Sequence, residues 1–235
     1  MSNLKPILFS SPMVQAILDG RKTMMRRIVK PQPPFFATIQ MFGEKPTPFY
    51  CANGCQTEIK LRYQPGDILR VRETWRIGAW DHFRRSIAVD YKADGFIRRE
   101  WLFIPDEKVF DKYVRQSSIQ ARDSGILPTE DGRFEWKPGE SPCRWRPSIF
   151  MPKAAARIFL KVTGVGAERL QEMTGRDMVE EGVARFPCDK KLDERYYFIE
   201  LWDSLNDKRG YGWDTNPWVW VYRFERCEKP QDAET

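Results

Sequence analysis

One lysine and a pair of glutamates in this sequence have the chemistry and the position for acid–base catalysis. Lys22 follows the glycine turn in the stretch GRKTMMRR, at a predicted helix-to-strand junction, and Glu180 and Glu181 precede Gly182 at the predicted end of a short helix. A lysine in a partly desolvated pocket can lose its proton near neutral pH, and a nearby glutamate can return that proton. A carboxylate at a helix C-terminus is disfavoured by the helix dipole, so its presence suggests a functional reason. The alternatives are a surface lysine that contacts phosphate and an ordinary exposed glutamate.

The sequence lacks the residues that many other classes of enzyme require. The single histidine, His82, excludes mechanisms that need a histidine pair, and no serine-hydrolase elbow, Walker loop or dinucleotide glycine fingerprint occurs. Cys51 and Cys55 in CANGC supply only half of the ligands of a tetrahedral zinc site. We therefore predict no cofactor, with zinc at these two cysteines as the minor alternative.

Charge favours an anionic partner. The net charge is +6, and residues 1–30 hold six lysines and arginines against one acid, Asp19. Such a basic bias is typical of proteins that bind phosphate, so we predict RNA, a nucleotide or a modified nucleoside as partner. A solvated basic face is the alternative. Because the five cysteines form no disulfide framework and neither a membrane span nor a signal peptide is recognised, we expect a cytoplasmic protein without membrane contact.

The patterns that must position these residues predict an α+β fold. Helices are predicted from Ser11 to Gly20, in a short segment opened by Thr174 and Asp177 as a capping box, and from Asp193 onward. In the first predicted strand, Thr23, Met25, Arg27 and Val29 share one face and Lys22, Met24, Arg26 and Ile28 the other. Strands are predicted over 22–29, from Ile68, over 86–91, 96–102, 154–165 and 218–225. We predict one domain over 1–235, with irregular insertions at 31–63 and 105–145 and a flexible tail at 227–235.

Four separated motifs resemble one known family. They are GRKT followed two residues later by an arginine, GDILRVRETW, LQEMTGRDMVEEGV, and LWDSLNDKRGYGWDTNPWVWVYRFER. In this order they resemble the ASCH domain, especially its longer phage- and prophage-type members, over residues 4–30, 65–75 and 145–226. The resemblance implies a PUA-like pseudo-β-barrel associated with RNA, with flanking helices and a cleft between barrel and helices.

The resemblance also implies site residues. In ASCH members similar to the small bacterial N4-acetylcytidine amidohydrolase, a lysine acts as base, a threonine three residues later as nucleophile, and a glutamate as proton donor. These positions fall on Lys22, Met25 and Glu181. Because a thioether has no proton to lose, Met25 cannot be the nucleophile. Thr23 is one substitute, and a water activated by Lys22 is another, with a backbone N–H or Arg26 as oxyanion donor.

Three functions follow from these observations. The first is a module that recognises RNA, a nucleotide or a modified base, and the second is an amidohydrolase that removes the acyl group of N4-acylcytidine-type nucleosides. The third is a ribonuclease. For binding, arginines are expected to meet anionic oxygens and tryptophans to stack on bases. Beside Lys22, the predicted ligand-binding set is Met25, Arg26, Arg27, Arg72, Glu73, Trp75 and Trp213.

Overall fold

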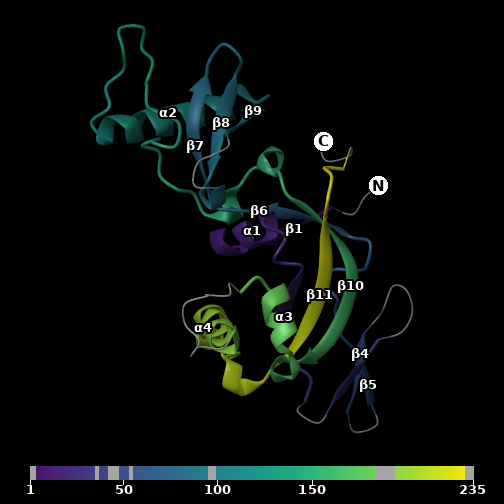
Figure 1. Ribbon diagram of the computed structural model, residues 1–235. Helices are drawn as coiled ribbons and strands as arrows, with labels where there is room; N and C mark the ends of the chain where they lie inside the picture. Colours follow the sequence, from purple (N-terminus) through teal and green to yellow (C-terminus); the bar gives the residue numbers. More distant parts are fainter. Residues whose placement is uncertain are drawn as a thin grey trace. The chain divides into compact units, whose positions relative to one another are not determined.

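The computed structural model describes residues 4–34, 37–41, 48–52, 55–94, 99–183 and 194–230 and has an α+β fold (Figure 1). The α-helices are α1 (Ser11–Leu18), α2 (Glu107–Asp123), α3 (Gly175–Glu180) and α4 (Glu194–Asn206). The strands are β1 (Leu4–Leu8), β2 (Met24–Ile28), β3 (Thr38–Gln40), β4 (Phe49–Ala52), β5 (Cys55–Glu58), β6 (Ile68–Arg72), β7 (Trp75–Asp81), β8 (Ser86–Tyr91), β9 (Arg99–Phe103), β10 (Phe159–Arg169) and β11 (Trp218–Cys227).

The chain divides into two compact units. The first comprises Met1–Lys5, Ala16–Leu69 and Ile158–Pro230, and the second Pro6–Gln15, Arg70–Arg157 and Gln231–Thr235. A five-stranded sheet has the order β1-β6-β10-β11-β2, and two three-stranded sheets have the orders β3-β4-β5 and β7-β8-β9. The α+β class is confirmed, but none of the sheets formed by the described residues closes into a barrel. The prediction of one domain over 1–235 is not tested by this division and stays a prediction.

In the first unit, β10 and β11 form a long antiparallel pair (Figure 1). Strand β2 pairs antiparallel with the other side of β11. A bulge between Val162 and Gly164 shifts the register of β10, and such bulges increase the local twist of a strand. Both faces of β11 are buried as far as Tyr222. Aromatic and β-branched residues in the segment WVWVY suit a strand that is covered on both sides.

Helices α3 and α4 contact each other at one end of these strands (Figure 1). The predicted capping box opens α3: the Thr174 side chain accepts from the Asp177 backbone N–H, and the Asp177 carboxylate accepts from the Thr174 N–H. Phe198 and Trp202 of α4 are buried in an apolar cluster with Met178 of α3. Leu205, near the end of α4, is 51% exposed.

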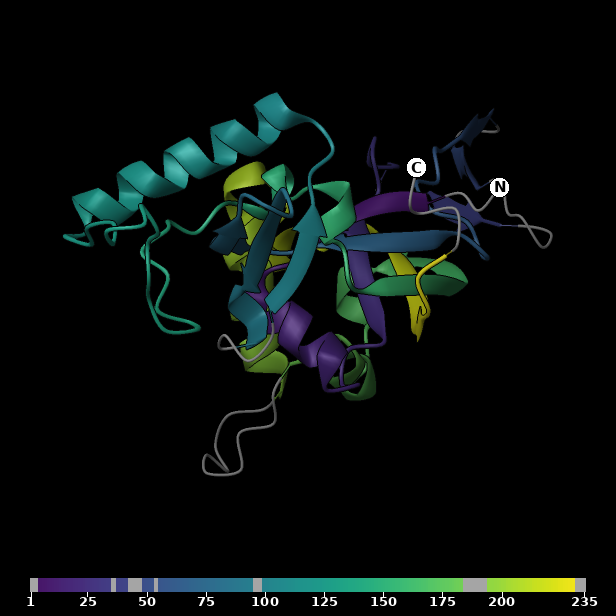
Figure 2. The ribbon, with the colours of Figure 1, turned by 90° about the horizontal axis from the view of Figure 1, so that it is seen from above.

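In the second unit, β7, β8 and β9 form an antiparallel sheet, and α2 contacts β7 (Figures 1 and 2). Asp106 caps α2 by accepting from the Val109 N–H at 3.1 Å. The insertion predicted at 105–145 as irregular therefore contains a 17-residue helix. The insertion at 31–63 likewise contains β3, β4 and β5. Both predictions of irregular structure were wrong, because short strands and a largely polar helix give weak periodic signals.

No helix among the described residues is long and apolar enough to cross a membrane. Of the expected tail, residues 231–235 lie outside the described residues, and Cys227 is the last residue of β11.

Candidate acid–base site

Backbone pairing brings Lys22 and Glu181 together in the first unit. The two residues form an isolated antiparallel bridge, and the Thr23 N–H donates to the Glu180 carbonyl at 2.9 Å. The Lys22 N–H donates to the Ala16 carbonyl at the end of α1, also at 2.9 Å. These bonds hold the start of the GRKT strand segment against the C-terminus of α3, and they place both charged side chains in the interior.

The side chains make direct contact. The Lys22 ammonium lies 2.6 Å from Glu181 Oε2 and also donates to the Glu181 backbone carbonyl at 2.7 Å. Lys22 is 3% exposed and Glu181 8% exposed. The carbonyl lies at the helix C-terminus, where backbone oxygens lack intrahelical partners, so the ammonium satisfies one of them.

A glycine permits this close approach. Gly182 adopts the left-handed conformation with φ of 87°. A Cβ at this position would lie 2.8 Å from the Ala16 Cβ and 2.9 Å from the Lys22 Cβ. A larger residue would therefore be strained and would push the end of α3 away from Lys22. Gly182 is thus required both by the turn and by the packing of the site.

Arg26 joins the pair in a charged cluster. Its Nε and Nη2 lie 2.8 and 2.6 Å from Glu168 Oε1, and Nη2 lies 3.5 Å from Asp177 Oδ2. Its Nη1 lies 3.4 Å from Glu181 Oε1 and 3.2 Å from the sulfur of Met24. All three guanidinium nitrogens thus face internal partners, and Arg26 is only 5% exposed. We call Lys22, Arg26, Glu168, Asp177 and Glu181 the acid–base cluster.

Burial and charge oppose each other at Lys22. Burial lowers the pKa of the Lys22 ammonium below its usual value, while the charge and hydrogen bond of Glu181 act in the opposite direction. The positive charges of Arg27 and Arg26 add to the lowering. Because the net shift is downward, Lys22 loses its proton more readily than a solvated lysine, as a general base requires.

The cluster has the parts of a proton relay. Its two cations face three carboxylates, and the shortest contact in the pair, 2.6 Å, joins the ammonium to a carboxylate oxygen. At this distance a proton can pass directly between Lys22 and Glu181. Arg26, whose nitrogens are occupied, orients Glu181 and does not have the open N–H that an oxyanion donor needs. The predicted roles of Arg26 in anion binding and oxyanion stabilisation do not fit this arrangement.

Strand alternation separates Lys22 from both candidate nucleophile positions. Met24 and Arg26 point toward α3, as does Arg223, which lies opposite Met24 and contacts Glu180. Because successive side chains alternate, Thr23 and Met25 point to the other face. Thr23 is exposed, and Met25 is 2% exposed and paired with Tyr222. Neither residue therefore lies on the face of Lys22, and Thr23 does not substitute for the missing nucleophile.

The other predicted ligand-binding residues are not part of this cluster. Arg27 is exposed on the strand face opposite Glu181, whereas Arg26 is buried. Trp213 is 7% exposed and packs in the apolar cluster of α3 and α4. A buried ring presents no face to a base, so the stacking role predicted for Trp213 does not fit the structure.

Arg72, Glu73 and Trp75 belong to the second unit. Arg72 is half-buried and donates to the carbonyls of Ile149 and Met151. Glu73 is 1% exposed and forms an ion pair with Arg157 at 2.8 Å. Trp75 is fully buried, so a base cannot stack on it. These contacts within the unit account for Glu73 and Trp75 without a ligand.

Two members of the cluster were missed as site residues. Asp177 was predicted only as a capping residue, yet its carboxylate also faces Arg26. Glu168 lies near the end of β10, and nothing in its local sequence distinguishes it from a surface glutamate; its role depends on the pairing of β10 with β11 and of β11 with β2. Within the described residues no group of three or more His, Cys, Asp or Glu side chains is arranged to hold a metal ion. The side chain of Cys55 lies outside the described part.

No family model, no curated protein and no solved structure matches this chain.

Proposed function

We propose that this chain is an ASCH-type protein with a PUA-like fold that binds a modified nucleoside and hydrolyses its exocyclic amide, as in an N4-acylcytosine. Lys22 serves as general base and Glu181 as general acid. The observation that carries the proposal is the 2.6 Å contact between Lys22 Nζ and Glu181 Oε2 in an almost fully buried pair. The four sequence motifs that resemble the ASCH domain support the substrate class.

Water is the nucleophile in this proposal, because neither Thr23 nor Met25 lies on the face of Lys22. The proton of the Lys22 ammonium first passes to Glu181 across the 2.6 Å contact. Neutral Lys22 then takes a proton from water, and the hydroxide oxygen bonds to the acyl carbon. Protonated Glu181 donates its proton to the leaving nitrogen as the carbon–nitrogen bond breaks, which yields the free acid and the unmodified base. Lys22 is then an ammonium and Glu181 a carboxylate again, so the ion pair is restored.

The test is incubation of the protein with N4-acetylcytidine, with chromatographic measurement of cytidine and acetate. We expect Lys22→Met and Glu181→Gln to lower the rate by a factor of about 100 or more, the usual contribution of a positioned acid or base. Arg176→Gln is the matched control because this arginine is exposed, lies on the same helix, and pairs with Glu180 instead of Glu181. The proposal is overturned if the unchanged protein forms no more cytidine than the two site variants. Circular dichroism must show that all of these proteins are folded.

Recognition of RNA or a nucleoside without hydrolysis is the second candidate. It is favoured by the position of Thr23 and Met25 on the strand face away from Lys22 and by exposed Arg27 on β2. Titration of a labelled RNA oligonucleotide at several salt concentrations tests it, since phosphate contacts make affinity fall steeply with salt. The same samples, run on a gel, reveal any strand cleavage and so test the ribonuclease alternative.

A further inference from the structure

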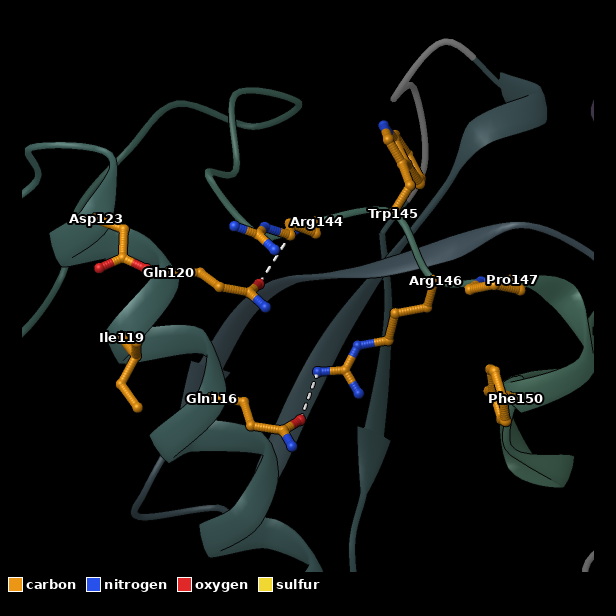
Figure 3. A pocket seen from close by; sticks show the side chains of 9 residues that line it. All are labelled: Gln116, Ile119, Gln120, Asp123, Arg144, Trp145, Arg146, Pro147 and Phe150. Atoms are coloured by element: carbon orange, nitrogen blue, oxygen red, sulfur yellow. Dashed lines mark hydrogen bonds between the residues drawn. The ribbon is translucent and has the colours of Figure 1, made fainter.

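A groove in the second unit lies between α2 and the segment 144–150 (Figure 3). Its volume is about 480 Å³, within the range of small-molecule sites. Gln116 and Gln120 reach into it from α2, and Arg146 approaches from the opposite wall with Phe150 beside it (Figure 3). The lining residues are Gln116, Ile119, Gln120, Asp123, Arg144, Trp145, Arg146, Pro147 and Phe150.

Hydrogen bonds turn both glutamine amides into donors toward the groove. Gln116 Oε1 accepts from Arg146 Nη2 at 3.2 Å, and Gln120 Oε1 accepts from the Arg144 backbone N–H at 3.0 Å. Both partners are obligate donors, so each amide oxygen is fixed toward the 144–146 segment and each NH₂ group is left to donate elsewhere. Within the described residues neither NH₂ group has a hydrogen-bond partner. The groove therefore presents donors to an acceptor-rich ligand.

Positive charge is held in place beside these amides. The Arg146 guanidinium lies 5.2 Å from the ring centroids of both Trp75 and Tyr113, which restrains it between two aromatic rings. Its backbone pairs with Trp75 in an antiparallel bridge. The Arg144 side chain is exposed at the rim. Asp123 is the only acidic residue of the lining, so the two arginines outnumber it.

Flat apolar surface completes the groove. Phe150 is 68% exposed and Ile119 is 50% exposed, so both present apolar surface at the groove. Trp145 forms part of the same wall, with the Arg76 guanidinium 4.5 Å from its ring centroid. An exposed ring beside guanidinium and amide donors suits a ligand that carries both a phosphate and a planar base.

We propose that this groove binds a nucleotide, with the phosphate on Arg144 and Arg146, the base against Phe150, and acceptor atoms of base or sugar on the amides of Gln116 and Gln120. Free nucleotides and single-stranded RNA share this chemistry. The proposal does not depend on the acid–base cluster, because all residues of the groove belong to the second unit and the cluster belongs to the first.

The test is calorimetric or fluorescence titration of the full chain with AMP, ribose 5-phosphate, a 12-nucleotide oligoadenylate and hexaglutamate. We expect AMP or the oligoadenylate to bind, and to bind more tightly than ribose 5-phosphate and hexaglutamate. Binding of AMP alone would identify a free nucleotide as the ligand, and binding of the oligoadenylate alone a single strand. Equal affinity for AMP and ribose 5-phosphate, tighter binding of hexaglutamate, or no binding at all would overturn the proposal.

Variants locate the binding in the groove. Arg144→Gln and Gln116→Glu are expected to weaken binding about tenfold or more, since each removes or opposes a contact to a charged group. Phe150→Leu keeps an apolar side chain but removes the ring, and it is expected to weaken AMP while leaving ribose 5-phosphate unchanged. Arg115→Gln is the matched control, because Arg115 is exposed on the same helix outside the lining. If the control weakens binding as much as Arg144→Gln, the groove is not the site.

Discussion

The buried pair of Lys22 and Glu181 gives the sharpest prediction, a double-mutant cycle on stability. Lys22→Met keeps the apolar stem and removes the ammonium, so Glu181 loses both its carboxylate contact at 2.6 Å and its carbonyl contact at 2.7 Å. Removal of one partner of a buried pair costs about 3–5 kcal/mol. We expect about 3 kcal/mol, the lower end, because Arg26 remains 3.4 Å from the carboxylate.

Glu181→Gln is expected to cost a similar free energy, because the Lys22 ammonium then remains buried without an opposite charge beside it. In the double variant no uncompensated charge is left, so the loss is expected to be about 2–3 kcal/mol, close to that of either single variant. The coupling free energy between the two positions is then about 3 kcal/mol.

The measurement is equilibrium unfolding in urea, followed by tryptophan fluorescence and by circular dichroism. The matched control is Arg176→Met. Its ion pair with Glu180 has a similar distance, 2.8 Å, but the arginine side chain is 87% exposed, so we expect a change within about 0.5 kcal/mol. If each single variant at the buried pair costs less than about 1 kcal/mol and the two losses add in the double variant, the pair is not coupled and the reasoning is refuted.

Three further predictions concern the surroundings of the pair. Gly182→Ala is expected to destabilise the protein by about 2 kcal/mol or more, because the new Cβ would lie 2.8–2.9 Å from its neighbours and φ is positive. Gly175→Ala is the control and is expected to be tolerated, since a Cβ there would have nothing within 4 Å. Thermal unfolding of the two variants distinguishes these outcomes. Although burial acts to raise the pKa of Asp177, hydrogen bonds from Thr174 and the charge of Arg26 lower it overall. The stabilisation from the Asp177 carboxylate is therefore complete above the unfolded pKa and is lost as pH falls through the folded pKa. We expect Asp177→Asn to flatten the decline in the free energy of unfolding below about pH 4. An unchanged decline at acid pH would contradict this reasoning. Arg26→Lys keeps the charge but removes the forked contact to the cluster, and we expect a loss of about 1–3 kcal/mol in urea unfolding; wild-type stability would show that charge alone suffices.

The internal neutralisation of the cluster changes how the basic N-terminal segment is understood. Two of its positive charges, on Lys22 and Arg26, are used inside the first unit against carboxylates, so they contribute little to an anion-binding surface. Arg27, the other arginine of β2, has an exposed side chain. A basic sequence segment can therefore indicate a buried charge network as well as a phosphate site.

Local sequence determined the parts of the fold whose signals lie within a few residues. The capping box of Thr174 and Asp177, the stop of α1 near Gly20 and the aromatic and β-branched residues of WVWVY each depend on neighbours along the chain. The structure contains α3, α1 and β11 at these places, with ends that differ from the predicted ones by about two residues. Residue types and flanking elements likewise identified Lys22, Glu180 and Glu181 as candidates, and the resemblance to the ASCH domain selected Glu181 as the partner of Lys22.

Only the tertiary structure decided which charges meet. Glu168 and Arg26 are 142 positions apart, and their contact arises from strand pairings that no local pattern specifies. The sequence did not predict the burial of Trp75 and Trp213 either, since a core aromatic residue and a surface aromatic residue have no distinguishing sequence pattern. Residue types determined what chemistry Lys22 and Glu181 could perform. The packing of α3 against the segment that leads into β2 determined that the two side chains lie together and are buried. The sequence could not show this burial, because desolvation depends on every element that covers a side chain.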